Sequence, residues 1–263
     1  MSEIRFIEGL LTELTPYVRE RYAARKTLSV ATKSNPTDLL TEVDVEVQQR
    51  AQRRLQSAYP DDLFIAEEEG LGLLPDDPDR RCWIMDPIDG TQNFVRGLFP
   101  AFGISLAFVR GGVVRAAGVM LPITGDLFLA ERGQGAFRNG ARLHVSDVDR
   151  LGHAWIEVDY GTQTKREETL RLSANIVVQA GAIRCVCAAV VGMCSIAAGD
   201  LDGYVHVGLN PWDYAAALLI VEESGGVATC ADGSPLRVFG PQNGVIVSNG
   251  RFHEELLAAL GRE

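Results

Sequence analysis

The sequence has no long hydrophobic run and no cluster of basic residues. The nearest candidate for a membrane span, residues 185–198, is shorter than the roughly 18 apolar residues that a spanning helix needs, and Gly192 and Ser195 interrupt it. Lys and Arg number 25 against 35 Asp and Glu, which leaves a formal net charge of -10. The basic residues gather only in short pairs such as Arg53-Arg54. The composition therefore argues against a membrane protein and against a partner bound through a nucleic-acid backbone.

Cysteine is scarce, and its spacing is not that of a structural zinc site. The five cysteines include no Cys-x-x-Cys pair and have no nearby pair of histidines. Three of them, Cys185, Cys187 and Cys194, occur in a segment of small and apolar residues, which favours buried, reduced thiols over the alternative of zinc binding. The first residues, MSEIRFIEGLLTEL, place acids among helically spaced apolar residues, unlike a secretory leader. We therefore expect a cytoplasmic protein.

The chain shows no low-complexity linker and no internal repeat. Its 263 residues and 46% apolar content suit one large domain or two closely packed ones. Helical spacing of apolar residues predicts a first helix that buries Ile4, Ile7, Leu10, Leu11, Leu14 and Val18. A second helix is predicted after a Thr41 cap, with a buried stripe of Val43, Val47, Ala51 and Leu55.

Two short apolar runs, DLFIA and RCWIM, read as buried strands that are each followed by acids. Glu67, Glu68 and Glu69 follow the first run, and Asp86 and Asp89 follow the second, so carboxylates are expected at one sheet edge. Residues 101–140 alternate strand-like runs with glycine-containing turns, which predicts an antiparallel meander. Further helices are predicted over residues 187–199 and 211–226.

The segment MDPIDGTQNF combines two carboxylates with a rigid bend. Asp86 and Asp89 flank Pro87, which can turn the Ile88 carbonyl inward, and hard divalent cations prefer such oxygen ligands. The amides of Gly90 and Thr91, at the start of a short predicted helix, would offer donors to an anion. The pattern indicates a metal-assisted phosphate-ester site, although an acidic turn can also simply cap a helix.

Two further observations bear on this site. Phosphatases of the haloacid-dehalogenase type carry a nucleophilic aspartate two residues before the Asp-Gly-Thr aspartate, and here that residue is Pro87. That chemistry is therefore excluded. Pro211 favours a helix start that places Asp213 in the first turn, where the acid could bind a metal or only favour the helix dipole.

Four dispersed motifs give the sequence its resemblance to a known family. KSNPTDLLTEVD, FIAEEE, WIMDPIDGTQNF and LNPWDYAAALLIVEESGG resemble, in order, those of the inositol monophosphatase family of magnesium-dependent, lithium-sensitive phosphomonoesterases. The resemblance covers nearly the whole chain. It implies an α/β (α+β) fold, a layered αβαβα sandwich of the inositol monophosphatase and fructose-1,6-bisphosphatase type. Residues 1–150 would form an N-terminal half and residues 151–263 a C-terminal half, packed as one unit, and homodimers are expected.

The resemblance also implies a site of two or three Mg²⁺ ions and a small-molecule phosphate ester as substrate. The implied metal ligands are Glu67, Asp86, the Ile88 carbonyl, Asp89 and Asp213. The implied catalytic residues, which would activate a water molecule, are Glu67, Thr91 and Asp44. The implied substrate contacts are Lys33, Asp89, Gly90, Thr91, Cys187, Ala188, His206 and Asp213. Lys33, Ser34 and Asn35 would belong to a flap over the metals, and a merely exposed Lys33 is the alternative.

The sequence departs from the family where the substrate alcohol is recognised. Cys187 and Ala188 replace a Gly-Ser/Thr pair, and His206 replaces a glutamate that binds inositol. We therefore expect a phosphatase of sugar, polyol or inositol monophosphates, with fructose 1,6-bisphosphate, histidinol phosphate and 3′-phosphoadenosine phosphates as alternative substrates. A regulatory or binding protein with little turnover is an alternative of another class, and a metal-stabilised structural protein is a third.

Overall fold

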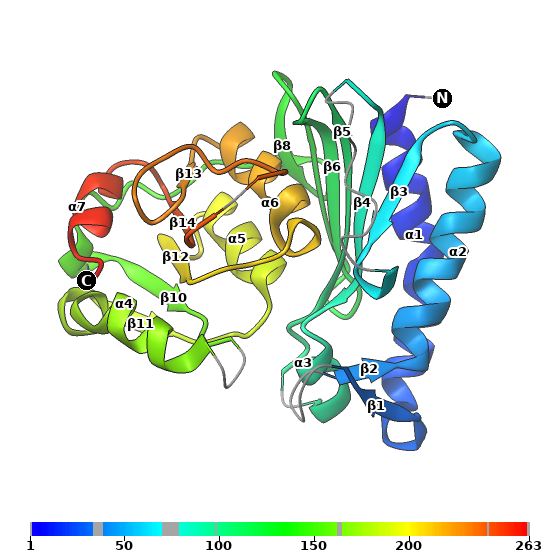
Figure 1. The fold of residues 1–263 in the computed structure, drawn as a ribbon, viewed down its shortest axis with the longest axis horizontal. Helices are drawn as coiled ribbons and strands as arrows, with labels where there is room; N and C mark the ends of the chain where they lie inside the picture. Colours follow the sequence, from blue (N-terminus) through cyan, green and yellow to red (C-terminus); the bar gives the residue numbers. More distant parts are fainter. Residues whose placement is uncertain are drawn as a thin grey trace.

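The computed structural model describes residues 2–33, 39–69, 79–97, 99–161, 165–240 and 242–261. They form five layers, in which helices and sheets alternate (Figure 1). Helices α1 (Glu3–Ala23) and α2 (Glu42–Ala58) cover the outer face of a seven-stranded sheet. Helices α5 (Ala189–Ala197) and α6 (Pro211–Glu223) lie between that sheet and a five-stranded one, whose other face is covered by α4 (Arg166–Gln179) and α7 (His253–Ala258). The predicted αβαβα sandwich is confirmed.

The first two helices form as their apolar spacing predicts. Of the expected stripe in α1, all residues but Ile4 are buried, and Ile4 is half-buried. Helix α2 begins after a Thr41 cap that forms a capping box with Asp44. The Thr41 side chain accepts from a backbone N–H in the first turn, and the Asp44 side chain accepts from the Thr41 backbone N–H. This local motif fixes Asp44 at the buried start of α2.

The seven-stranded sheet follows chain order from β3 to β9. Its strands are β3 (Leu63–Ala66), β4 (Cys82–Asp89), β5 (Gly103–Arg110), β6 (Val113–Leu121), β7 (Asp126–Glu131), β8 (Gly135–Arg138) and β9 (Ala141–Arg142). All neighbours are antiparallel except β3 and β4, so the predicted meander is confirmed. The parallel pairing brings the C-terminal ends of β3 and β4 to one edge. The expected end of β4 at Met85 is wrong, because the strand continues through an irregularity to Asp89.

The five-stranded sheet has the order β11-β10-β12-β14-β13. Its strands are β10 (Trp155–Val158), β11 (Ala182–Arg184), β12 (Gly203–His206), β13 (Val227–Thr229) and β14 (Val245–Ser248). Alternate residues face opposite layers: Ile156 and Val158 pack in the cluster with α4 and α7, whereas Tyr204 and Val247 pack in the cluster with α5 and α6. Two smaller elements complete the site region, the hairpin of β1 (Val30–Thr32) with β2 (Leu39–Thr41) and the helix α3 (Thr91–Arg96).

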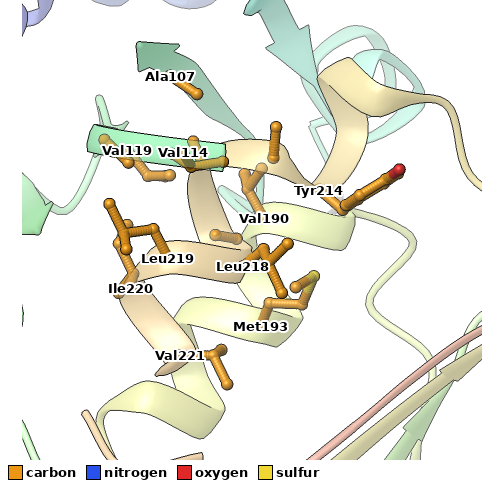
Figure 2. Packing of buried hydrophobic residues seen from close by; sticks show 14 of the residues in the cluster. Ala107, Val114, Val119, Val190, Met193, Tyr214, Leu218, Leu219, Ile220 and Val221 are labelled. Atoms are coloured by element: carbon orange, nitrogen blue, oxygen red, sulfur yellow. The ribbon is translucent and has the colours of Figure 1, made fainter. Parts of the chain in front are cut away.

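The central helix layer joins the two sheets through one apolar core. Val190 and Met193 of α5 and Leu218 and Leu219 of α6 lie close together, with Val119 of the large sheet beside them (Figure 2). Both helices are rich in small apolar residues and hydrophobic on nearly all sides, as buried helices are. No helix in the described ranges has the length and apolar character required to cross a membrane.

Candidate active site

Carboxylates from two parallel strands meet at one edge of the large sheet. Glu67 opens the short turn that follows β3, and Asp86 lies in β4, where Ala66 pairs with Met85. Asp86 is 2% exposed and Asp89 is 8% exposed. Buried carboxylates of this kind are rare unless they are paired with a donor, a cation or a metal.

The bend at Pro87 positions polar atoms in the way that the sequence predicts. The Ile88 N–H donates to Asp86 Oδ1 at 2.9 Å. Thr91 Oγ1 lies 2.9 Å from the Ile88 carbonyl and 3.1 Å from Asp44 Oδ1, so its proton is shared between these two acceptors. The Thr91 hydroxyl is therefore held in place by the start of α2 and by the bend itself.

Gly90 allows the chain to turn from β4 into α3. It has φ 84°, in the left-handed region that favours glycine. A Cβ atom there would lie 2.9 Å from the Ala188 Cβ and 3.0 Å from the Ala101 carbonyl. A side chain at this position would therefore be strained and would collide with the start of α5.

Helix starts hold both Asp213 and Asp89 at the site, although Asp89 itself ends strand β4. Asp213 lies in the first turn of α6, where its Oδ2 accepts from the Asn210 N–H at 2.7 Å. The helix-capping role considered for Asp213 is thus present, and the same side chain also lines the cavity. The Asp89 oxygens accept from the N–H groups of Ala189 (3.3 Å) and Val190 (3.0 Å) in the first turn of α5. Both halves of the chain therefore contribute to one site.

Burial and mutual repulsion govern the charge of these acids. Burial raises the pKa of Asp86 well above its ordinary value, and the nearby carboxylates of Glu67, Asp89 and Asp213 raise it further. The pKa of Asp89 is raised in the same way, first by burial and then by Asp213. Burial raises the pKa of Asp213 to about 7, against the hydrogen bond from Asn210. Gathering these carboxylates costs free energy that a bound cation would offset.

Lys33 forms two ion pairs at the rim of this cluster. Its Nζ lies 2.7 Å from Glu67 Oε1 and 2.7 Å from Glu68 Oε1. Burial would lower the pKa of Lys33, but these two carboxylates raise it overall. Burial raises the pKa of Glu68 to about 7. Lys33 thus is not merely exposed, whereas Ser34 and Asn35 of the expected flap lie outside the described residues.

A cavity of about 590 Å³ opens over the carboxylates. Of the predicted site residues, the structure places these in its wall: Glu67, Asp89, Gly90, Thr91, Cys187, Ala188 and Asp213. Asp44 and Asp86 are buried. Asp44 accepts a hydrogen bond from Thr91 of the wall, and Asp86 lies close enough to Glu67, Asp89 and Asp213 for their charges to raise its pKa.

His206 is placed differently from the expected substrate contact. It is 5% exposed, is absent from the described wall of the cavity, and accepts a hydrogen bond from the Gly208 N–H at 3.0 Å through Nδ1. Gly161 lies over it, because a Cβ there would be 3.1 Å from His206 Nε2. Burial lowers the pKa of His206, which favours the neutral ring. His206 therefore supports the wall from behind.

Several wall residues were not predicted from the sequence, among them Asp159, Tyr160 and Arg166. Asp159 directly follows β10, which is parallel to both of its neighbours, so it reaches a strand end as Glu67 does. That signal was present in the sequence. Arg166, at the start of α4, carried no comparable signal, because only tertiary packing brings this helix over the cavity.

The cysteines also differ from expectation. Cys194 is buried in α5 as predicted, but Cys185 and Cys187 are exposed and line the cavity. Cys187 has φ 58°, so it cannot belong to the helix that was expected to start there, and α5 begins at Ala189. The expectation that Cys185 and Cys187 are buried is wrong for this reason.

The donor set suits a hard divalent cation in its chemistry, since it combines carboxylates with the Ile88 carbonyl. Across the ranges that the structure describes, however, no group of three or more His, Cys, Asp and Glu side chains is arranged to hold a metal ion. The acids are instead engaged internally: Glu67 by Lys33, Asp89 by α5 and Asp213 by Asn210. Metal binding would have to replace some of these contacts.

Comparisons with known proteins identify the family and agree with the fold. The model of the inositol monophosphatase family matches residues 2–263. The chain is 36% identical over 233 residues to the fructose-1,6-bisphosphatase/inositol-1-monophosphatase of Thermotoga maritima, covering 88% of this chain and 86% of that protein. It is 36% identical over 200 residues to the Nus factor SuhB of Vibrio cholerae, covering 75% and 74%. The crystal structure of the extragenic suppressor protein suhB from Bartonella henselae matches with a TM-score of 0.88 at 29% identity, covering 97% of this chain and 96% of that one.

Proposed function

This chain belongs to the inositol monophosphatase family and is a phosphatase, and from that premise we propose that it hydrolyses a sugar, polyol or inositol monophosphate with Mg²⁺. The observation that supports this most is the convergence of acids from three distant segments. Glu67, Asp89 and Asp213 line one cavity, and Asp86 lies buried beside them. Because their charges repel, this arrangement is costly without a cation and suits a site that binds one.

The family is generally metal-dependent, and the oxygen atoms gathered beside this cavity are of the type that a hard divalent cation prefers. We propose that Glu67, Asp86, the Ile88 carbonyl, Asp89 and Asp213 hold two or three Mg²⁺ ions. Bound Mg²⁺ would supply a Lewis acid for the phosphoryl group and would lower the pKa of a water molecule.

The residues around the bend have separate roles in this proposal. The Thr91 hydroxyl donates a hydrogen bond to Asp44. In this proposal its oxygen would accept a hydrogen bond from the attacking water, so that a proton could move from the water through Thr91 to the buried Asp44 carboxylate. Glu67, at the cavity wall, would help to orient the same water. The amides of Gly90 and Thr91 would donate to the phosphate oxygens. Each group lies in or directly behind the cavity wall.

The alcohol half of the substrate would meet a wall that differs from the family pattern. Cys187 and Ala188 offer a thiol and a methyl group in place of a hydroxyl donor, and Asp159 and Arg166 add one charge of each sign. We therefore propose a broad preference for polyol monophosphates, with fructose 1,6-bisphosphate, histidinol phosphate and 3′-phosphoadenosine phosphates as the alternatives to test. The resemblance also predicts a homodimer and inhibition by lithium.

A panel of phosphate esters assayed with and without Mg²⁺ tests this function. The wild type should release phosphate from at least one polyol monophosphate only with the metal, and Asp86→Asn should lower the rate by more than about 100-fold. Asp61→Asn is the matched control, because Asp61 is an exposed aspartate next to the same sheet. Equal inertness of the wild type and Asp86→Asn across the panel, with Mg²⁺ bound, would rule out the phosphatase proposal.

A binding function is the second candidate, and the likeness to the Nus factor SuhB of Vibrio cholerae favours it. On this hypothesis the fold would present a surface to a macromolecular partner, with little turnover. Full hydrolytic activity of the isolated chain on a polyol phosphate would count against it. Partner binding that survives Asp86→Asn unchanged would count in its favour.

A further inference from the structure

The loop between β11 and α5 brings two thiols together in the wall of the cavity. The Sγ atoms of Cys185 and Cys187 are 3.4 Å apart, and both side chains are exposed. The other cysteines, Cys82, Cys194 and Cys230, are buried. Small thiol reagents should therefore reach this pair first.

The backbone holds the two sulfur atoms on the same side. Val186, between them, donates its N–H to Glu157 Oε1 at 3.2 Å and accepts at its carbonyl from Asn93 Nδ2 at 2.7 Å. The left-handed conformation of Cys187, with φ 58°, turns its side chain back toward Cys185. Closing a disulfide requires the sulfur atoms to approach by about 1.4 Å more, since an S–S bond is about 2.05 Å long. Side-chain rotation can supply most of that movement.

The two thiols are chemically unequal. The two sulfur atoms lie within hydrogen-bonding distance of each other, and the hydrogen bond with Cys187 lowers the pKa of Cys185 to about 7 although burial opposes the shift. That hydrogen bond raises the pKa of Cys187, which keeps its proton. Cys185 is thus the better attacking thiolate near neutral pH.

We propose that Cys185 and Cys187 form a thiol–disulfide switch at the mouth of the active site, oxidised by low-molecular-weight disulfides. The Cys185 thiolate attacks one sulfur of the small disulfide, forms a mixed disulfide and expels one small thiolate. Cys187 then loses its proton to water and attacks the Cys185 sulfur, which closes the protein disulfide and expels the second small thiolate. The protein is oxidised by two electrons, and the small disulfide is reduced to two thiols.

Closure should impair the neighbouring catalytic groups. Cys187 precedes Ala188 and the first turn of α5, whose Ala189 and Val190 amides hold the Asp89 carboxylate. Drawing the Cys187 sulfur toward Cys185 therefore strains the segment that positions Asp89. The thiol chemistry is independent of the proposed function, and only its effect on hydrolysis rests on that function.

The test treats the reduced full-length chain at pH 7 with glutathione disulfide. Intact-mass measurement should show the loss of two hydrogen atoms, and a colorimetric thiol reagent should find both rapidly reacting thiols gone. Cys187→Ser should stop at the mixed disulfide and gain the mass of one glutathionyl group. Cys185→Ser should react slowly, and Cys230→Ser, which changes a buried thiol, should behave as the wild type does.

Hydrolysis is then compared within each protein as the ratio of oxidised to reduced activity. Oxidised wild type should be at least about 10-fold less active than reduced wild type, and dithiothreitol should restore the activity. Cys187→Ser cannot close the ring, so its oxidised form should not show the loss of activity that ring closure causes. Retention of two glutathionyl groups, crosslinking between chains, or an unchanged wild-type ratio after ring closure would each overturn the proposal. If the reduced wild type hydrolyses no ester, the proposed function fails. The mass and thiol measurements would still show whether Cys185 and Cys187 form a disulfide.

Discussion

Ser105 donates a hydrogen bond from its hydroxyl to the main-chain carbonyl of Trp212 at 3.2 Å. The same Oγ accepts from the Asp86 N–H at 3.3 Å, so one buried hydroxyl connects the aspartate bend of β4 to the first turn of α6. Asp86 and Asp213 are far apart in the sequence, and Ser105 fixes the backbone of one strand relative to that of the helix. We regard Ser105 as a positioning residue for the carboxylate cluster.

Ser105→Ala should therefore weaken both stability and metal binding. Removing the hydroxyl leaves the Trp212 carbonyl and the Asp86 N–H without this partner, which should cost about 1–3 kcal/mol of unfolding free energy. Thermal unfolding and a calorimetric Mg²⁺ titration measure the two effects. Ser173→Ala is the control, since Ser173 is buried but donates only to the Thr169 carbonyl within α4. Equal effects of the two substitutions on Mg²⁺ affinity would contradict the positioning role.

The metal-free protein should lose stability as the pH rises through about 7. Burial raises the pKa of Asp213 from its ordinary value near 3.9 to about 7, so the folded state binds this proton more tightly than the unfolded state. The stabilisation is complete below about pH 4 and is lost as the pH rises through 7. Denaturant unfolding in EDTA should show a loss on the order of 2–3 kcal/mol between pH 5 and pH 8.

Asp213→Asn supplies the control for this pH dependence. It removes the titrating group while keeping an oxygen that can accept from the Asn210 N–H, so the slope should flatten. Saturating Mg²⁺ should also reduce the slope in the wild type, because the cation takes the place of the proton. A stability that rises from pH 5 to pH 8 without metal would show that the carboxylates are not repelling one another as described.

Lys33→Gln should tighten Mg²⁺ binding. The Lys33 ammonium contacts both Glu67 and Glu68, so it competes with the metal for Glu67 and repels it. We expect the affinity for Mg²⁺ to rise by about 3–10-fold. The metal-free protein should lose about 0.5–1 kcal/mol through the lost ion pairs. Lys26→Gln, at an exposed lysine, should change neither quantity, and weaker Mg²⁺ binding by Lys33→Gln would mean that Lys33 helps to build the metal site.

Cys187→Gly should stabilise the protein. Cys187 has φ 58°, a conformation that costs a residue with a side chain about 1–2 kcal/mol relative to glycine. Part of that gain is lost because glycine has more freedom in the unfolded chain, so we expect a net gain of about 0.5–1 kcal/mol in reversible unfolding. Cys185→Gly is the control, since Cys185 does not have a positive φ and should lose stability. Destabilisation by both substitutions to the same extent would refute the strain argument.

Periodic elements were predictable from the sequence, because burial imposes its spacing on them. The stripes of α1 and α2, the meander and the Pro211 start of α6 all follow from patterns that span one element. The Thr41 cap likewise rests on residues three apart. The prediction that acids of two strands meet at one sheet edge succeeded for Glu67 and Asp86 because β3 and β4 are parallel neighbours, although β4 continues past Asp86 to Asp89.

Features that depend on packing between distant segments were not predictable. Strand alternation decides which face a residue such as His206 points to, but the sequence does not reveal which face borders the cavity. The exposed Cys185 and Cys187 depend on a left-handed residue that only the surrounding loop imposes. Arg166 joins the wall because α4 packs across the far sheet, which involves contacts beyond any local pattern.

The central helices give the molecule a mechanical property. Helices α5 and α6 pack against the large sheet in one hydrophobic core, and an amide of α5 binds Asp89. The two sides of the active site therefore cannot separate without exposing this core. This fold therefore does not open by a hinge motion between two lobes. Substrate entry and product departure must instead rely on small rearrangements at the rim.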